Sequence, residues 1–169
     1  MNRFLTATAA FALLVVAGTS TALADNRVVV DQRGRYNGAA AVQDGDRNRA
    51  EIRQRGYENM GRGWQDGDRN RVVIDQRGKR NGAYSEQQGV NNLAVIGQDG
   101  RNLNADTYQS GKGNITGVAQ IGSNSSVVTT QSGKNNTLGV IQLGNGQGTT
   151  VNQSGTGNIT VVIQGGGRR

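Results

Sequence analysis

Apolar and polar positions alternate along the chain after residue 25, and the alternation returns every eleven residues. In the first unit, Asn26, Val28, Val30 and Gln32 share one parity, and mostly polar residues occupy the other. Successive side chains of a strand point to opposite faces, so these four residues face one side. The next four residues contain Gly34 and predict a turn. Each unit is therefore predicted to be one strand and one turn.

The repeat has no insertion or deletion across thirteen units. Its glutamines are Gln32, Gln43, Gln54, Gln65, Gln76, Gln87, Gln98, Gln109, Gln120, Gln131, Gln142, Gln153 and Gln164. A glycine follows two residues later each time, at Gly34, Gly45, Gly56, Gly67, Gly78, Gly89, Gly100, Gly111, Gly122, Gly133, Gly144, Gly155 and Gly166. Most units open with asparagine, at Asn26, Asn37, Asn48, Asn59, Asn70, Asn81, Asn92, Asn114, Asn136 and Asn158. A fixed period of this kind indicates a repeat architecture.

A longer period of 22 residues is also present. Alternate units all open with asparagine, whereas the intervening series drifts to Leu103, Ser125 and Gln147. We predict an all-β solenoid with two strands and two turns per 22-residue rung, about 6.5 rungs in all, stacking into cross-β fibres. Stacked glutamines and asparagines are expected to form amide ladders, which leucine or serine would interrupt locally.

Two other structures compete for this pattern. Eleven residues also fit three helical turns, but glycine in every unit and many asparagine, threonine and valine residues disfavour a helix. The composition also fits a disordered, prion-like chain. Disorder gives no reason for an unbroken eleven-residue register, although the secreted monomer can be disordered before it assembles.

Composition narrows the functional classes. Hydrophobic residues make up 34% of the chain, so a thick core is excluded and thin, repetitive packing is favoured. The chain has no cysteine and no histidine, which removes disulfides, thiolate chemistry and the commonest general base. We therefore expect no enzyme activity, no catalytic residue, no metal site and no cofactor.

The N-terminus resembles a secretory signal peptide. Arg3 precedes a largely apolar run from Phe4 to Ala17, which is short for a membrane span, and Ala22-Leu23-Ala24 is a small-x-small cleavage pattern. We expect residues 1–24 to be the signal peptide and 25–169 to be the exported repeat solenoid, with no transmembrane segment in the mature chain.

The ends of such a solenoid predict its function. The first and last rungs expose unpaired backbone N–H and C=O groups, which solenoids normally cover with atypical terminal repeats. The first unit begins at Asn26, and only five residues follow Gln164. We expect the ends to pair with further copies of the chain, so that the molecule is its own partner.

These residues resemble the curlin repeat, whose pattern is S/N-x5-Q-x-G-x2-N-x-A-x3-Q. The rung of Asn26, Gln32, Gly34, Asn37, Ala39 and Gln43 fits it, as does the rung that begins at Asn70. The rung from Asn48 has Gly61 in the alanine place, and the later rungs lose the middle asparagine. The resemblance implies a structural subunit of extracellular, pilus-like amyloid fibres in the biofilm matrix. It also implies two partners, a nucleator subunit and an outer-membrane export pore.

Two features depart from that family. Curlin subunits usually carry a non-repetitive segment after the signal peptide, and none is visible here. The familiar major subunit is acidic, whereas this chain has a formal charge of +7. The alternatives are therefore a nucleator subunit, or a soluble β-solenoid that binds polysaccharide or ice. An ice-binding face would repeat threonine in every rung, which Thr129, Thr149 and Thr150 do not.

Charge is concentrated in the N-terminal half. Between residues 25 and 101 there are 14 basic and 11 acidic residues, and few charges follow. These charges are interpreted as a solvated face, as gatekeepers that slow assembly, or as a site for DNA or anionic polysaccharide at Arg33, Arg55 and Arg77. The segment from Asp44 to Asn48 resembles a calcium loop but lacks its later ligands, so a turn is favoured.

Overall fold

The computed structural model describes residues 11–17 and 25–166 as β-strands joined by tight turns. The strands are β1 (Phe11–Ala17), β2 (Arg27–Arg35), β3 (Gly38–Asp44), β4 (Arg49–Tyr57), β5 (Met60–Asp68), β6 (Arg71–Lys79), β7 (Gly82–Val90), β8 (Leu93–Lys112), β9 (Ile115–Lys134), β10 (Thr137–Asn145), β11 (Gly148–Thr156) and β12 (Ile159–Gly165). β8 and β9 each continue through a turn, so each spans two of the eleven-residue units.

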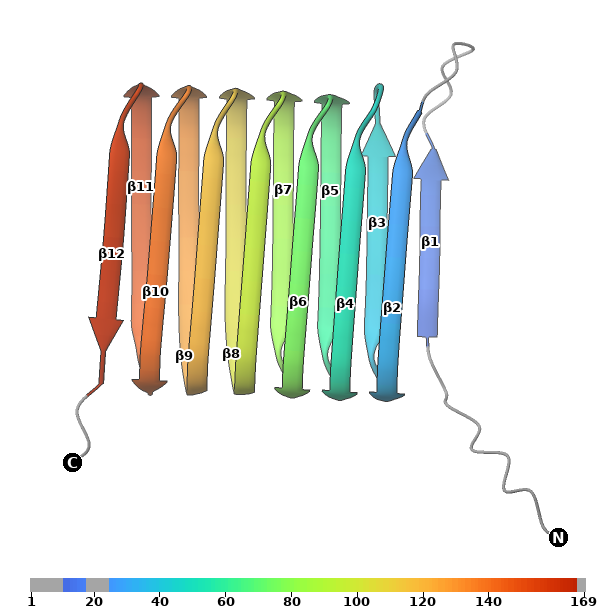
Figure 1. Ribbon diagram of the computed structural model, residues 1–169, viewed down its shortest axis with the longest axis vertical. Helices are drawn as coiled ribbons and strands as arrows, with labels where there is room; N and C mark the ends of the chain where they lie inside the picture. The colour runs from blue at the N-terminus through green and yellow to red at the C-terminus, as the bar shows by residue number, and fades with distance from the viewer. Residues whose placement is uncertain (1–10, 18–24, 167–169) are drawn as a thin grey trace, which may run out of the picture.

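The strands form two layers, and every strand pairs in parallel with a strand of the next rung (Figure 1). The front layer contains β2, β4, β6, the first halves of β8 and β9, β10 and β12. The back layer contains β3, β5, β7, the second halves of β8 and β9, and β11. Partners lie 22 residues apart, as in Gln32 opposite Gln54 and Gln54 opposite Gln76. The predicted β-solenoid with 22-residue rungs is confirmed.

The turns depend on the glycine that follows each glutamine. Gly34 has φ +114°, and a Cβ placed on it would lie 1.9 Å from the carbonyl oxygen of Gly56 in the next rung. Glycine is thus required by both backbone conformation and close approach. Two residues later a second left-handed residue completes the turn, as at Tyr36 (φ 59°) and Arg47 (φ 57°). The sequence pattern does not reveal this second position, because its residue type varies.

The interior between the two layers is thin, because each layer contributes a single level of inward-facing side chains. Ile52, Val72, Ile74 and Ile96 are completely buried between the layers, and the turn-proximal asparagines and glutamines flank them. Later rungs place hydroxyl groups there, such as Thr129. A core this narrow leaves much of the packing to in-register contacts between rungs.

The predicted signal peptide, residues 1–24, falls largely outside the described residues, as does its expected cleavage site after Ala24. Its described part is β1, which pairs in parallel with β3 from Phe11 opposite Gly38 to Ala17 opposite Gln43. The register of this pair is irregular between Ala12 and Val15. Among the described residues, no helix is long and apolar enough to cross a membrane.

Candidate functional site

The thirteen repeat glutamines lie in two hydrogen-bonded columns, one per layer. In the back layer, Nε2 of Gln43 donates to Oε1 of Gln65 at 2.7 Å, and Gln65 donates to Gln87 at 2.9 Å. The same bond joins each glutamine of the back layer to the next as far as Gln153. In the front layer it joins each glutamine to the next from Gln32 to Gln164. Every donor points toward the C-terminal end. Each column therefore begins with a carbonyl oxygen and ends with an amide nitrogen.

The asparagines behave differently from the amide ladder expected from the sequence. Nδ2 of Asn48 donates to the carbonyl oxygen of Asp44 at 3.0 Å and also to that of Gly67. Its Oδ1 accepts the backbone N–H of Asn70 at 2.9 Å. Direct bonds between asparagine side chains occur at a few positions only, such as Asn59 to Asn37. Asparagine is shorter than glutamine and lies beside the turn, where its side chain reaches the turn's carbonyl groups. The asparagines therefore join the turn of one rung to the turn of the next.

The three non-asparagine residues of the back layer interrupt this pattern. The N–H of Leu103 donates to Oδ1 of Asn81 at 3.1 Å, but leucine offers no acceptor to the next rung. Ser125 Oγ accepts the N–H of Gln147 at 3.2 Å. Nε2 of Gln147 donates to the carbonyl oxygen of Leu143 at 2.8 Å. The rungs that contain these residues therefore keep only part of the turn bonding.

The two ends of the solenoid contain unsatisfied groups. Within the described residues, β2 pairs with β4 only, β11 with β9 only and β12 with β10 only. Two buried acceptors near these edges have no hydrogen-bond partner, Oε1 of Gln43 and Oε1 of Gln147. Gln43 ends the back-layer glutamine column at β3, and Gln147 directly precedes β11. A buried, unpaired carbonyl is costly, so both ends favour a further strand.

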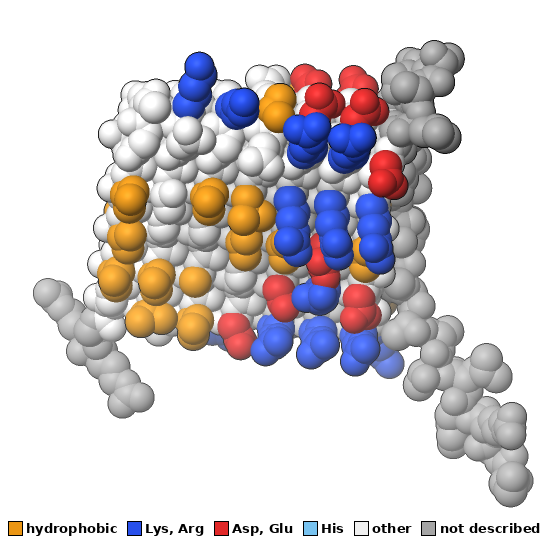
Figure 2. Space-filling model, turned by 45° about the horizontal axis from the view of Figure 1, so that its top comes forward, with side chains coloured by type: hydrophobic (Ala, Val, Ile, Leu, Met, Phe, Trp, Pro, Cys, Tyr) orange, Lys and Arg blue, Asp and Glu red, His pale blue; other side chains and the backbone are white. Residues whose placement is uncertain are grey.

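The outer face of the front layer is charged over β2, β4 and β6 (Figure 2). Arg33, Arg55 and Arg77 stack in register at one end of these strands. Arg33 lies 3.5 Å from Asp31, and Arg77 lies 3.8 Å from Asp75. The structure thus brings the three predicted polyanion contacts into one row.

Arg27, Arg49 and Arg71 form a second row at the other end of the same strands. Glu51 lies beside this row and is buried, with 7% of its surface exposed. It forms ion pairs with Arg49, Arg53 and Arg71. Glu51 is thus shared by Arg49 and Arg71 of this row, whereas Asp31 and Asp75 each pair with one arginine of the first row.

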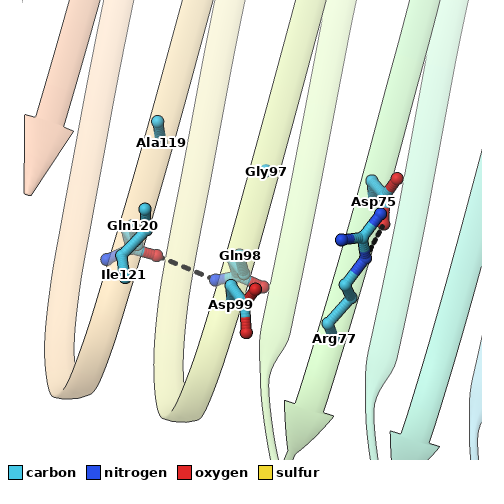
Figure 3. Close-up of a pocket in the computed structure, with 8 residues that line it drawn as sticks. All are labelled: Asp75, Arg77, Gly97, Gln98, Asp99, Ala119, Gln120 and Ile121. Atoms are coloured by element: carbon cyan, nitrogen blue, oxygen red, sulfur yellow. Dashed lines mark hydrogen bonds and ion pairs between the residues drawn. The ribbon is translucent and has the colours of Figure 1, made fainter.

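The same face becomes apolar over β8, β9, β10 and β12 (Figure 2). Its exposed residues are Val95, Ile115, Ile121, Ile141, Leu143, Ile159, Val161 and Ile163. A hollow of about 260 Å³ marks the change (Figure 3). The Asp75–Arg77 pair lies on one side of it, Ala119 and Ile121 lie on the other, and Gly97 leaves the space between them open. Sequence parity indicates which residues face outward, but the hollow depends on Gly97 lying between larger neighbours.

The two turn edges differ in their balance of charge in the N-terminal half, one being mainly basic and the other mixed with an excess of acidic residues. One edge has Arg35, Lys79, Arg80 and Arg101 beside Tyr36 and Tyr57, whose rings meet edge to face at 5.3 Å. Lys79 lies 5.0 Å above the Tyr57 ring, and Arg80 binds Glu58 at 2.8 Å, which lowers the pKa of that carboxyl. The other edge contains Asp44, Asp46, Asp66 and Asp68 together with Arg47 and Arg69. There, Asp68 Oδ1 accepts the N–H of Asp46, so the carboxylate stabilises the turn.

The larger aromatic residues lie on the outer face of the back layer. Trp64 and Tyr108 are both 38% exposed, and the rings of Tyr84 and Tyr108 are 5.7 Å apart. Burial and a 3.0 Å hydrogen bond to Glu86 raise the pKa of Tyr84 to about 12. Tyr84 and Tyr108 thus pack on each other between neighbouring rungs.

The family model of the curlin associated repeat matches residues 24–56, 45–78 and 67–100. These are the rungs that keep asparagine in both layers. The later rungs, which contain Leu103, Ser125 and Gln147, keep the same fold outside the matched region. No curated protein and no solved structure matches the chain significantly.

Proposed function

Because the chain is a curlin-repeat protein, we propose that it is a structural subunit that polymerises end to end into extracellular amyloid fibres of a biofilm matrix. The observation that carries the proposal is the pair of unfinished ends. The glutamine columns stop at open strand edges at β2, β11 and β12, and two buried carbonyl oxygens near the two ends, those of Gln43 and Gln147, lack partners. A further copy supplies the same strands, amides and glycines in the same register.

The fibre role includes further partners and a location. Export as an unfolded chain through an outer-membrane pore, nucleation by a second subunit at the cell surface, and adhesion are proposed from the curlin repeats. The alternative of a nucleator role uses the same open ends, because a template must present strands that another subunit can extend.

The first test follows residues 25–169 after dilution from denaturant. We expect a lag phase, then dye-binding, unbranched fibres with a meridional reflection at about 4.8 Å. A folded, β-rich species that stays monomeric at high concentration would instead support the alternative of a soluble binding solenoid.

A matched pair of variants tests whether growth uses the ends. Val30 faces the interior like its neighbour Ile52, but it is 39% exposed because β2 is an edge strand. Val30→Lys places a charge where the next subunit must stack, so we expect at least a tenfold loss of elongation rate, since an unpaired buried charge is costly. Val29→Lys points outward beside Glu51 and should elongate normally. Equal rates for the two variants would exclude axial stacking on this end.

We also propose that the assembled fibre binds DNA or an anionic polysaccharide along the row of Arg33, Arg55 and Arg77. The row is supported by its neighbours on the basic turn edge, and arginines repeated at about 4.8 Å suit a polyanion. Changing all three to glutamine should weaken heparin binding and reduce its dependence on salt. The same change at Arg27, Arg49 and Arg71 is the control, because it removes the same charge from the other end of the strands, where Glu51 already binds Arg49 and Arg71. Equal weakening by both triple variants would indicate general charge attraction only.

A further inference from the structure

Consecutive units of the solenoid are related by a half-turn about the axis along which the rungs stack. β2 lies in the front layer and β3 in the back layer, and the two run in opposite directions (Figure 1). Each half-turn advances the chain by half a rung, about 2.4 Å at the usual strand spacing. A unit therefore pairs with the unit after next, and this rule holds for all units from β2 to β12.

Residues 25–166 contain thirteen units, and this odd number makes the layers unequal. The first unit, β2, and the last, β12, both lie in the front layer. The front layer has seven strand segments and the back layer six, since the back layer ends at β11. The outer edges of a subunit are thus β2 and β3 at one end, and β11 and β12 at the other.

A second subunit can stack on β11 and β12 in two ways. Without rotation, its β2 pairs with β12, and the back layer then lacks one strand between β11 and the incoming β3. After a half-turn, its β2 pairs with β11 and its β3 pairs with β12. The half-turn also reverses the direction of β2, so both new pairs are parallel, as within the subunit. Only the rotated arrangement continues both layers without a gap.

The unpaired buried acceptors distinguish the two arrangements. Gln147 opens the unit of β11, and Gln43 lies in β3, so both belong to the back layer where the unrotated arrangement leaves its gap. In the rotated arrangement, the N–H of the incoming Asn26 faces Oε1 of Gln147. The bond repeats the one from the N–H of Asn48 to Oδ1 of Asn26, which is 2.8 Å long.

The second acceptor gains a partner in the same step. Nε2 of Gln164, at the end of the front-layer column, faces Oε1 of the incoming Gln43. The bond repeats that of Gln142 to Gln164, at 3.1 Å. Within the full chain β1 pairs with β3, with Ala17 as the register partner of Gln43, and Oε1 of Gln43 has no hydrogen-bond partner there.

We infer that successive subunits in a fibre of residues 25–169 are related by a half-turn about the fibre axis, so that the structural repeat is two molecules. The inference rests on the proposed end-to-end assembly and adds its symmetry. Each subunit then lengthens the fibre by about 31 Å, and the structure repeats every two subunits, about 62 Å. In unrotated stacking with a gap, each subunit lengthens the fibre by about 34 Å, and this length is also the repeat. The charged and apolar parts of the front face appear alternately on opposite sides of the fibre.

Paired cysteines test the arrangement, and the chain has no cysteine of its own. Asp31 lies opposite Asn152 of the neighbouring subunit after a half-turn, but opposite Ile163 without rotation. We expect Asp31→Cys combined with Asn152→Cys to cross-link within fibres under mild oxidation, since directly opposed parallel residues lie within disulfide range. The control, Asp31→Cys with Ile163→Cys, should stay largely unlinked. In a single molecule the two cysteines of either pair lie at opposite ends of the solenoid. A cross-link therefore reports only a junction between two subunits.

The outcomes separate the symmetry from the assembly. Cross-linking of the Asn152 pair with a repeat of about 62 Å by electron cryomicroscopy supports the half-turn. Cross-linking of the Ile163 pair with a repeat of about 34 Å overturns the half-turn and leaves the fibre function intact. Failure of unmodified residues 25–169 to form fibres overturns both. If a double variant assembles poorly, the repeat measured on unmodified fibres decides.

Discussion

At the scale of single residues, glutamine and asparagine bond to different partners, although both side chains end in an amide. The glutamines bond to one another through the interior, whereas the asparagines bond mainly to turn carbonyls. The sequence could predict that both face inward, because parity fixes the face of a strand. It could not predict the partners, which depend on how far each side chain reaches from the turn. It also could not reveal that Gln43 and Gln147 are left unpaired.

The turn glycines give a sharp prediction. Gly78 has φ +109°, and a Cβ there would lie 1.9 Å from the oxygen of Gly100. Gly78→Ala should therefore destabilise the subunit by about 2–4 kcal/mol, which raises the concentration left in solution at equilibrium by more than tenfold. Gly117→Ala is the control, because Gly117 has nothing within 4 Å of the new methyl group. A small effect at Gly78 would mean that the turn conformation differs.

The pKa of Tyr84 gives a prediction about pH. Burial, together with the bond to Glu86, raises this pKa from 10.0 to about 12. The neutral phenol is favoured in the folded state, so its contribution to stability is complete below pH 10 and is lost as pH rises through 12. Phenolate absorbance of fibres carrying Tyr36→Phe, Tyr57→Phe and Tyr108→Phe, in which Tyr84 is the one remaining tyrosine, should show this late ionisation. Glu86→Gln should bring it nearer to 10; an unchanged titration would exclude the role of Glu86.

At the scale of elements, strands with the same interior differ on their outer face. β2, β4 and β6 carry stacked arginines with acidic partners, whereas β8, β9, β10 and β12 expose isoleucine, leucine and valine. The sequence indicated this division, because outward positions can be read from parity. The convergence of three arginines on Glu51 was not predictable, since it joins residues from two rungs.

Glu51 is expected to hold the charged strands together. Glu51→Gln leaves Arg49, Arg53 and Arg71 without their shared carboxylate, so the lag before fibre growth should lengthen and should shorten steeply when salt is added. Glu58→Gln is the control, since Glu58 is only half-buried and pairs with a single arginine, Arg80. Dye-binding kinetics at two salt concentrations measure both. Equal lags for the two variants would contradict a special role for Glu51.

At the scale of the whole molecule, the fold was predictable because a single period governs the described chain from β2 to β12. An unbroken spacing of eleven fixes strand, turn and partner together, so a few residues determine every rung. The three matched stretches are the rungs nearest to the curlin pattern, and the remainder keeps the fold with altered back-layer residues. The odd strand count and its effect on the ends emerge only when units are assigned to layers.

Hydrogen exchange can show how molecules join. Axial growth gives new backbone partners to the end strands alone, so in fibres the amides of β2 and β12 should exchange as slowly as those of β6. Mass spectrometry of peptic fragments would measure this. Fast exchange at β2 and β12 beside a protected β6 would instead mean that solenoids associate side by side.

The uneven front face has a consequence for accuracy. A chain that docks on its template one rung out of phase still places glutamine over glutamine and glycine over glycine, so the interior cannot detect the mistake. The outer face can: in the half-turn arrangement, a slip of 22 residues docks β5 on β12 and places Arg62 beside the exposed Val161, where the aligned β3 places Ala40. Such a charge is stranded among apolar neighbours, and the slipped state is higher in energy than the aligned one. The change from charged to apolar outward residues along the axis therefore distinguishes rungs whose interiors are alike, and it favours the correct register when subunits join.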